Sequence, residues 1–182
     1  VAVAAPLVVT IRSSEDSLPE AVDDESRVTA ILRYQGGRVV AAPMDVFGAP
    51  RQRIGYDMAA AVILDSADPE SLDVAQRQAL IDYMLGGGVV ILPAPNDQAD
   101  PSATWLAPYL PAMRIGSRYA TTINVTQGRG SHTFKLSAPV TLTEWCPLDQ
   151  PSDSVKVIAA DSQYVHIATR AVGLGKLVVT SF

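Results

Sequence analysis

Residues 72–92 read LDVAQRQALIDYMLGGGVVIL, and this stretch decides the fold. Asp73 and Gln76 stand three residues apart, which is the spacing of a capping box at the start of a helix. The apolar residues that follow recur at helical spacing and share one face; they are Ala79, Leu80, Tyr83 and Met84. The glycines Gly86–Gly88 predict the end of the helix. The apolar run Val89–Leu92 then predicts a strand directly after it.

A second apolar run, Ala59–Leu64, precedes this helix and is followed by Asp65. A continuous apolar run of this length is typical of a strand that is covered on both faces. Strand, helix and strand in succession predict a right-handed parallel crossover. We therefore expect a three-layer α/β domain of the flavodoxin-like type, with helices on both faces of a mostly parallel sheet.

The flanking sequence adds further predicted elements. Before this unit we expect a strand, a helix and a second strand: Leu7–Ile11, Glu25–Gln35 and Arg38–Ala42, the last stopped by Pro43. After it, Trp105–Leu110 predicts a short helical turn. The rest is β-rich, with predicted short strands at Thr121–Thr126, His132–Leu136, Val140–Leu142 and Val155–Ala159. Tyr164–Arg170 and Lys176–Phe182 flank Gly173-Leu174-Gly175 and predict a terminal hairpin.

Composition limits the classes of function. A chain of 182 residues with 48% hydrophobic residues fits a single globular domain, here 1–182. The net charge of −5 offers no basic stripe, so we expect no nucleic-acid partner. No apolar run is long enough to span a membrane. The chain begins with the apolar stretch Val1–Val9 and ends inside a predicted strand, so we expect a domain excised from a larger protein. Val1–Val9 is either a buried strand or the end of a membrane segment.

The chain has one cysteine and two histidines, and none has a metal-ligand spacing. Cys146 lies between Trp145 and Pro147, and we expect a buried structural thiol. For His166, within a predicted strand, we also expect a structural role. His132 ends the glycine-rich segment Gly128-Arg129-Gly130-Ser131-His132, which suits either a turn or contact with a ligand.

Polar side chains follow the two buried strands of the predicted crossover. Asp65, Ser66 and Asp68 come after the first strand, and Asn96, Asp97 and Asp100 come after the second. Because parallel strands end at the same edge of a sheet, we expect these residues to converge there. Their oxygen atoms suit Ca²⁺ or Mg²⁺, and they equally suit solvated loops and helix caps. We predict ligand contact by Asp65, Ser66, Asn96, Asp97 and His132, with no metal and no cofactor.

Three segments together resemble the class I glutamine-amidotransferase-like superfamily. They are Tyr56-Asp57 with Val62–Asp65, the stretch 72–92, and Gly173–Phe182. The similarity is greatest with the non-enzymatic branch found in bacterial membrane-associated proteins, and looser with trehalose-utilisation-type domains. It covers residues 56–95 and 173–182, and elsewhere only the order of the elements.

The resemblance implies where a catalytic residue belongs. In catalytic members the strand after the glycines ends in a sharp elbow that carries a cysteine, activated by a histidine. Here the equivalent stretch is Pro93-Ala94-Pro95-Asn96-Asp97, which contains no cysteine, serine or threonine. Its two prolines also disfavour the geometry of an elbow. We therefore expect a pseudoenzyme with no catalytic residues.

The expected function is that of a non-catalytic amidotransferase-like domain that binds a protein partner or a small ligand. The parent is expected to be a larger, membrane-anchored bacterial protein with further domains. We expect this domain outside the cytoplasm, with a soluble cytoplasmic location as the alternative. The alternative function is a carbohydrate-processing or hydrolytic enzyme of the trehalose-utilisation type. Fold alone does not choose between them.

Overall fold

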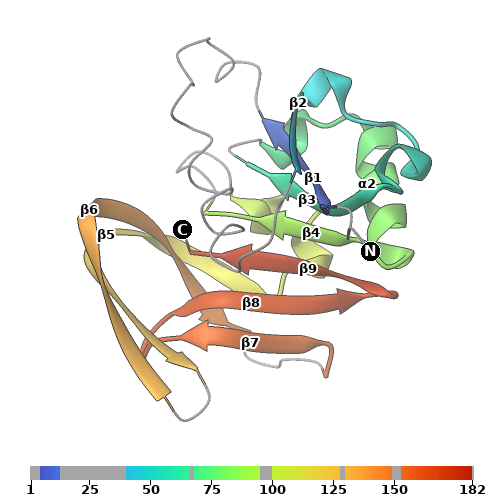
Figure 1. Ribbon diagram of the computed structural model, residues 1–182. Helices are drawn as coiled ribbons and strands as arrows, with labels where there is room; N and C mark the ends of the chain where they lie inside the picture. Colours follow the sequence, from blue (N-terminus) through green and yellow to red (C-terminus); the bar gives the residue numbers. More distant parts are fainter. Residues whose placement is uncertain are drawn as a thin grey trace.

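A computed structural model describes residues 5–12, 40–65, 68–94, 100–127, 130–148 and 153–181. Nine strands within these ranges form one sheet, in the order β2-β1-β3-β4-β9-β8-β6-β5-β7 (Figure 1). The strands are β1 (Leu7–Arg12), β2 (Val40–Asp45), β3 (Ala59–Leu64), β4 (Val89–Leu92), β5 (Ala112–Gln127), β6 (Gly130–Pro147), β7 (Val155–Ala160), β8 (Val165–Val172) and β9 (Gly175–Thr180). The helical elements are α2 (Val74–Leu85) and the 3₁₀ turns η2 (Val46–Gly48), η3 (Arg53–Tyr56), η4 (Pro69–Ser71), η5 (Pro101–Ala103) and η6 (Ala107–Tyr109).

The strands of the amino-terminal half, together with β9, form the parallel part of the sheet. Strands β2, β1, β3 and β4 pair with their neighbours in parallel, and β9 pairs in parallel with β4. The predictions for β1, β3 and β4 are confirmed, with β1 one residue longer than expected. The prediction that Pro43 stops β2 is wrong, because β2 continues to Asp45. Since β2 lies at the edge of the sheet, the missing N–H of a proline there need not break a hydrogen bond.

The helix α2 begins as its sequence predicts. The Asp73 carboxylate accepts a hydrogen bond from Gln76 N at 2.9 Å, and Gln76 Oε1 accepts one from Asp73 N at 2.8 Å. The predicted apolar face is buried at Ala79, Leu80, Tyr83 and Met84. Gln76 is buried as well, and its Nε2 donates to the carbonyls of Val46 and Ala49. The helix therefore fixes the segment that follows β2 through a polar side chain.

The layers differ from the expectation in one respect. Within the described ranges α2 is the single α-helix, and it lies beside the parallel part of the sheet (Figure 1). The predicted helix Glu25–Gln35 lies outside the described residues. The structure thus establishes a mixed α/β fold dominated by its sheet, and it does not show helices on both faces. None of the helices in the described ranges is long and apolar enough to cross a membrane.

The carboxyl-terminal section is β-rich, as expected, but its strands are longer than predicted. Strand β5 has 16 residues and β6 has 18, and the two form one antiparallel hairpin. The prediction of separate short strands at Thr121–Thr126, His132–Leu136 and Val140–Leu142 is therefore wrong. Pro139 does not divide β6, because it falls where the register shifts. Ala120 pairs with Val140 there, whereas Thr122 pairs with Lys135.

The terminal hairpin is confirmed. Strands β8 and β9 pair antiparallel up to Val172 and Gly175, with Gly173 and Leu174 as the turn. The φ of Gly173 is 61°, which suits the first residue of a type II′ turn. Strand β9 also pairs in parallel with β4, so it joins the parallel half of the sheet to the antiparallel half.

The two glycine-rich segments that carry the family resemblance contact each other. Leu174 N donates to Leu85 O, and Lys176 N donates to Gly88 O, both at 3.1 Å. A Cβ atom on Gly175 would overlap the backbone oxygens of Gly88 and Met84. The end of α2 therefore packs directly on the start of β9, and this contact requires a residue without a side chain.

Among the described residues, the buried hydrophobic side chains form two clusters. The main core contains residues of α2 and of the parallel strands, together with Ala112 and Trp145 from the base of the β5–β6 hairpin. A second cluster lies farther out on the same hairpin and contains Ala120, Ile123 and Leu142, with Val140 against it.

Candidate functional site

The carboxyl ends of the parallel strands share one edge of the sheet. Asp65 lies at the end of β3, and its N–H donates to Ile11 O at 3.0 Å. Its carboxylate forms an ion pair with Arg12 from the end of β1, with 3.3 Å between Arg12 Nε and Asp65 Oδ2. The structure thus places Asp65 at the predicted edge, and a cation from the neighbouring strand is paired with it.

The other predicted ligand residues are placed only in part. Ser66, Asn96 and Asp97 lie outside the described residues. The backbone of His132 lies in β6 opposite Val125, and its side chain is not among those described. Contact of these residues with a ligand therefore stays a prediction.

Two further acids near this edge are caps. Asp68 Oδ1 accepts from Glu70 N at the start of η4, and Asp100 Oδ1 accepts from Ser102 N at the start of η5, both at 2.9 Å. For Asp68 and Asp100 the alternatives were metal ligation, a solvated loop and helix capping, and the structure supports capping. Within the described ranges, no three His, Cys, Asp or Glu residues are grouped so that they could hold a metal ion.

A buried polar cluster, which the sequence did not indicate, lies at the same edge. His166 near the start of β8 and Ser181 just after β9 are each 1% exposed. His166 Nδ1 lies 3.0 Å from Ser181 Oγ, and His166 Nε2 lies 3.2 Å from Asp161 Oδ2. Both ring nitrogens therefore have partners, and the cluster joins the β7–β8 turn to the carboxyl end of β9.

The β5–β6 hairpin completes the cluster with two charged side chains. Arg118 Nη2 donates to Asp161 Oδ2 at 3.1 Å, and Arg118 Nε lies 3.8 Å from Glu144 Oε1. The Arg118 guanidinium also lies 4.8 Å from the centre of the Tyr164 ring, within the range of a cation–π contact. The Glu144 carboxylate raises the pKa of the Tyr164 hydroxyl, and burial and their hydrogen bond act in the same direction.

The Asp161 carboxylate accepts more hydrogen bonds than any other group of the cluster. Besides Arg118, the backbone N–H groups of Gln163 and Tyr164 donate to it at 2.8 and 2.7 Å. Burial acts to raise the pKa of Asp161, but these two backbone donors act against it. With the added effect of His166 and Arg118, the pKa of Asp161 falls below its usual value. The carboxylate is therefore held in its charged form.

The contacts run from serine to histidine to aspartate, which is the order of a nucleophilic triad. A nucleophile must reach its substrate, however, and Ser181 is 1% exposed. The cluster links the β7–β8 turn to the residue after β9, an arrangement that fits the structural role expected for His166.

The turn after β4 is the position of the nucleophile in amidotransferases. The chain there continues through Pro93 and Ala94, and the described residues between Asp100 and β5 contain only the 3₁₀ turns η5 and η6. Cys146 lies within β6 opposite Met113 and is half-buried, so the single thiol of the chain is part of a strand and not of a turn.

No protein-family model matches the sequence, and no curated protein matches it. Solved structures do resemble it in fold. The cytoplasmic protein STM1381 from Salmonella typhimurium LT2 has a TM-score of 0.67 at 12% identity, over 96% of this chain and 87% of that chain. A ThuA-like protein from Bacteroides uniformis ATCC 8492 has a TM-score of 0.66 at 12% identity, over 100% of this chain and 84% of that chain.

A third likeness is to part of a larger enzyme. The exo-β-1,4-mannosidase Op5Man5 from Opitutaceae bacterium strain TAV5 has a TM-score of 0.57 at 12% identity, over 97% of this chain and 31% of that chain. Identities this low establish a shared fold and nothing more. The chain therefore shares its fold with STM1381 and with the ThuA-like protein from Bacteroides uniformis.

Proposed function

We propose that this chain is a non-catalytic amidotransferase-like domain that binds a partner or a small ligand. One observation carries the proposal: the segment after β4, Pro93-Ala94-Pro95-Asn96-Asp97, contains no nucleophilic side chain. The glutamine-hydrolysing members of the superfamily that the sequence resembles use a cysteine thiolate at that position. A domain that keeps this fold but has lost the nucleophile can still bind a partner or a ligand.

The position of Cys146 supports the proposal. Cys146 pairs with Met113 across the hairpin, one residue before the β5–β6 ladder ends at Pro147. A nucleophile on a tight turn projects its side chain towards a substrate, whereas a residue inside a ladder is confined by the strands on either side. Cys146 is therefore unsuited to replace the missing cysteine.

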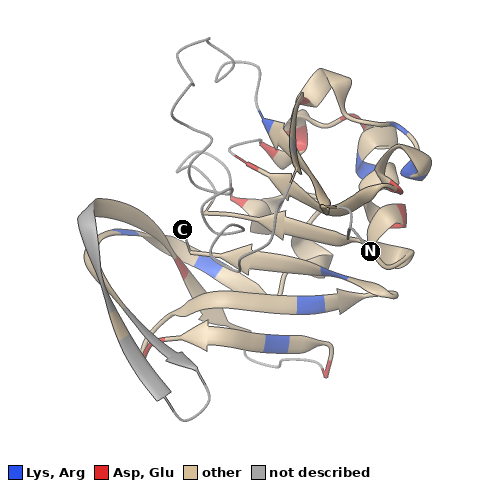
Figure 2. Cartoon of the chain, in the orientation of Figure 1, with Lys and Arg blue, Asp and Glu red and all other residues tan. Residues whose placement is uncertain are grey.

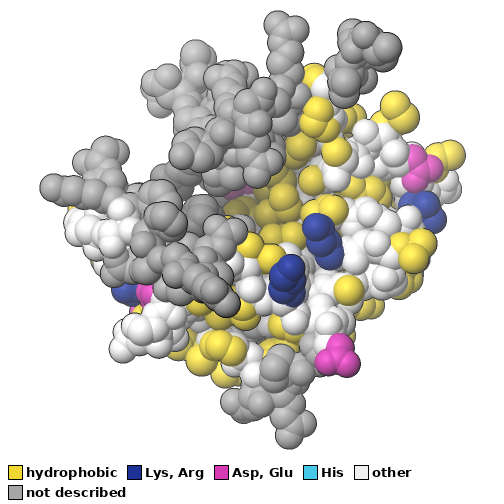
Figure 3. All heavy atoms as spheres, turned by 60° about the horizontal axis from the view of Figure 1, so that its bottom comes forward, with side chains coloured by type: hydrophobic (Ala, Val, Ile, Leu, Met, Phe, Trp, Pro, Cys, Tyr) yellow, Lys and Arg dark blue, Asp and Glu magenta, His cyan; other side chains and the backbone are white. Residues whose placement is uncertain are grey.

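Exposed apolar side chains support a protein partner. Phe47, Ile54, Met58 and Val74 are each at least 73% exposed, and they lie on η2, η3, the turn after η3 and the start of α2. Figure 3 shows hydrophobic side chains at the surface of the face that it turns forward. Basic and acidic residues lie on both halves of the molecule (Figure 2), so charge does not favour one surface for such a partner.

The ligand residues and the cellular setting are further parts of the proposal. Asp65, Ser66, Asn96, Asp97 and His132 are the proposed ligand contacts at the carboxyl edge. The sequence resemblance suggests a larger, membrane-anchored parent protein with this domain outside the cytoplasm. STM1381, which shares the fold, is described as cytoplasmic and favours the alternative of a soluble location. Cell fractionation with an antibody to this domain would decide between the two.

A glutaminase assay tests the absence of catalysis. Ammonia release from glutamine should not exceed the rate without protein, for the native chain and for Cys146→Ala alike. A glutamine-analogue alkylator should leave Cys146 unlabelled. Ammonia release that disappears in Cys146→Ala would refute the proposal and make this a glutamine-dependent enzyme.

A thermal-shift screen tests for a small ligand. Divalent metals, sugars, nucleotides and amino acids including glutamine are compared at equal concentrations. A ligand at a hundred times its dissociation constant stabilises the folded state by about 2.7 kcal/mol. For a domain of this size that corresponds to roughly 5–10 °C in Tm. A shift that is lost in Asp65→Asn would place the ligand at the carboxyl edge, and no shift with any class would favour a protein partner.

A carbohydrate-processing enzyme is the second candidate, because a mannosidase contains this fold. A glycosidase needs one carboxylic acid that is protonated at working pH and a second that is charged. The carboxylates of Glu144 and Asp161 both contact Arg118. The pKa of Asp161 is lowered, however, which is the wrong direction for a general acid. Release of nitrophenol from nitrophenyl glycosides, abolished in Glu144→Gln, would establish this activity, and we expect none.

A further inference from the structure

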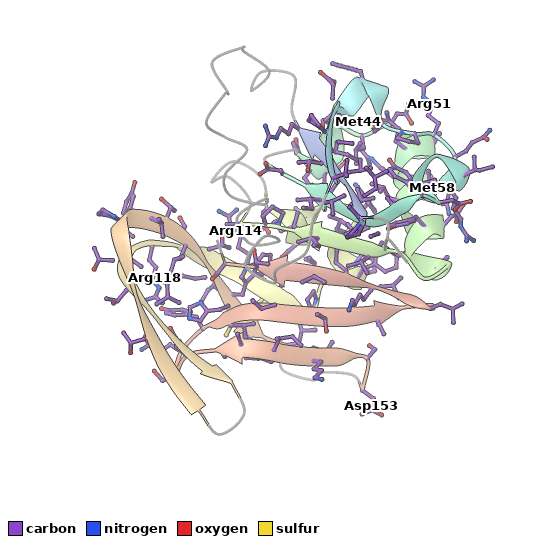
Figure 4. All side chains as sticks on the ribbon, in the orientation of Figure 1. Met44, Arg51, Met58, Arg114, Arg118 and Asp153 are labelled. Atoms are coloured by element: carbon purple, nitrogen blue, oxygen red, sulfur yellow. The ribbon has the colours of Figure 1, made fainter. Side chains whose placement is uncertain are left out.

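Four exposed apolar side chains lie around the end of α2, on the side where the parallel strands β3, β4 and β9 begin. Met58 and Leu174 are 84% and 86% exposed, and Ile54 and Leu85 are exposed as well. The end of α2 and the β8–β9 turn point away from the β5–β6 hairpin (Figure 1), and Met58 lies on that same side (Figure 4). These four residues are the amino-edge patch.

Leu85 and Leu174 form one half of the amino-edge patch. Leu174 N donates to Leu85 O at 3.1 Å, so the two residues are neighbours although they come from α2 and from the β8–β9 turn. Gly87 is exposed beside them, and a Cβ atom added to it would lie 3.9 Å from Leu174 Cβ. Because Gly87 has no side chain, it does not screen the leucines from an approaching surface.

Ile54 and Met58 form the other half, and Arg53 connects this half to the helix. The Arg53 guanidinium lies against Gly86 at the end of α2, where an added Cβ would overlap it. Asp57, just before Met58, pairs with Arg53 at 3.5 Å between Nε and Oδ1. The two halves therefore meet at the end of α2.

Hydrogen bonds fix the backbone beneath the amino-edge patch. Tyr83 Oη donates to Ala59 O at 2.9 Å, which ties the start of β3 to α2. Lys176 N donates to Gly88 O at 3.1 Å, which ties the start of β9 to the same helix end. An apolar surface on a backbone that is already fixed loses little conformational entropy when a partner covers it.

The two strands that end the sheet order are poorly suited to pair with another chain. In β2, Val40 N donates to Pro6 O beside β1. Backbone groups alternate between the two edges of a strand, so Pro43 faces outward, where it offers no N–H. In β7 the register against β8 shifts between Val157 and Ala159. Proline and irregular pairing both hinder the addition of a strand, so a partner of this domain has to be bound through side chains.

The charges of this surface are balanced. Arg53 and Asp57 lie among the four apolar side chains and are each about half exposed, with 51% and 49% of their side chains accessible. Asp82 and Lys176, one helical turn before Gly86 and two residues after Leu174, add one charge of each sign. A strongly charged partner gains nothing from such a surface. A two-fold interface, by contrast, places Arg53 of one copy opposite Asp57 of the other, so the surface is complementary to itself.

We propose that a second copy of this chain docks on the amino-edge patch, with Arg53 and Asp57 forming ion pairs across a two-fold axis. The proposal rests on the proposed binding function and names its protein partner. Leu85 and Leu174 of each copy pack against Ile54 and Met58 of the other. The carboxyl edge, with the proposed ligand contacts, stays outside this interface.

Sedimentation velocity of the native chain and of two glutamate variants tests the interface. Leu174→Glu places a charge inside the amino-edge patch. Phe47→Glu is the matched control, because Phe47 is 82% exposed outside the patch and the net charge changes equally. We expect the native chain to dimerise as its concentration rises. Leu174→Glu should raise the dimer dissociation constant at least about tenfold, and Phe47→Glu less than about twofold.

Mixing two charge variants tests the two-fold arrangement. Arg53→Asp leaves only anions at positions 53 and 57, and Asp57→Arg leaves only cations there. Exposed ion pairs contribute little to stability, so both variants should fold, which circular dichroism checks. Each variant alone should sediment as a monomer, because like charges face each other across the axis. An equal mixture of the two should form a heterodimer, because opposite charges then face each other.

Three results would overturn the proposal. The first is a native chain that stays monomeric at its highest soluble concentration; the patch would then belong to a different partner. The proposed function would still stand in that case, because the glutaminase assay tests it independently of association. The second is a dimer that Phe47→Glu weakens as much as Leu174→Glu does. The third is a mixture of the two charge variants that stays monomeric.

Discussion

Replacing Gly175 by alanine should destabilise the protein strongly, although it adds a single methyl group. The new Cβ would overlap the backbone oxygens of Gly88 and Met84 and would lie 2.8 Å from the carbonyl carbon of Gly87. Backbone atoms at the junction of α2 and β4 cannot rotate away as a side chain can. Overpacking in a well-packed interior costs about 1–3 kcal/mol, and we expect the upper part of that range. For a domain of this size the Tm should fall by roughly 4–10 °C.

Gly48→Ala is the matched control, because the nearest atom to its added Cβ is Met44 Cγ at 3.7 Å, an ordinary contact. Alanine restricts the unfolded chain more than glycine does, so Gly48→Ala should leave the free energy of unfolding unchanged or raise it by up to about 1 kcal/mol. Urea unfolding, followed by far-UV circular dichroism, gives the free energy of unfolding of both variants. If Gly175→Ala is as stable as Gly48→Ala, the contact between the two glycine-rich segments is not as tight as the structure has it.

Three further predictions concern the polar groups of the fold. Gln76→Ala should lower the free energy of unfolding by about 2–3 kcal/mol, because it leaves the carbonyls of Val46 and Ala49 without their buried donor. Its control, Gln78→Ala on the exposed side of α2, should change the free energy of unfolding by less than about 0.5 kcal/mol. Trp145→Phe should cost about 2–4 kcal/mol in the same urea assay, because it removes a buried hydrogen bond and leaves a cavity. The folded-state pKa of Asp161 is lowered, so its stabilising effect is present above the unfolded value of about 3.9 and is lost as the pH falls through the folded value. The stability difference between the native chain and Asp161→Asn should therefore be constant near neutral pH and shrink below about pH 4; a difference that grows on acidification would contradict the assignment.

The features that could be predicted from the sequence are those encoded by neighbouring residues. The capping box of Asp73 and Gln76, the apolar face of α2 and the turn at Gly173 each depend on residues a few positions apart. Each is present in the structure as expected. Strand β3 was also predicted with its observed bounds, because a buried parallel strand is a continuous apolar run.

The hairpin and the polar cluster could not be predicted, because both depend on contacts between distant residues. Pro139 indicates a break in a single strand, and only the shifted pairing with β5 shows how β6 accommodates it. Arg118, Asp161 and Ser181 come from separate elements and share no sequence period. The Asp161 side chain, which accepts from backbone groups two and three residues ahead, was the one local signal that the sequence offered.

The position of β9 has a consequence for how the protein folds as it is made. This strand lies between β4 and β8 in the sheet, yet it follows β4 by about 80 residues, which a ribosome adds in ~4–16 s. During that interval the apolar edge of β4 has no partner strand, and α2 has no Gly175 to pack upon. Nascent chains in that state expose a β-edge of the kind that chaperones shield and that aggregates recruit. Expression yield should therefore depend more on chaperone supply and growth temperature than the stability of the finished domain would suggest.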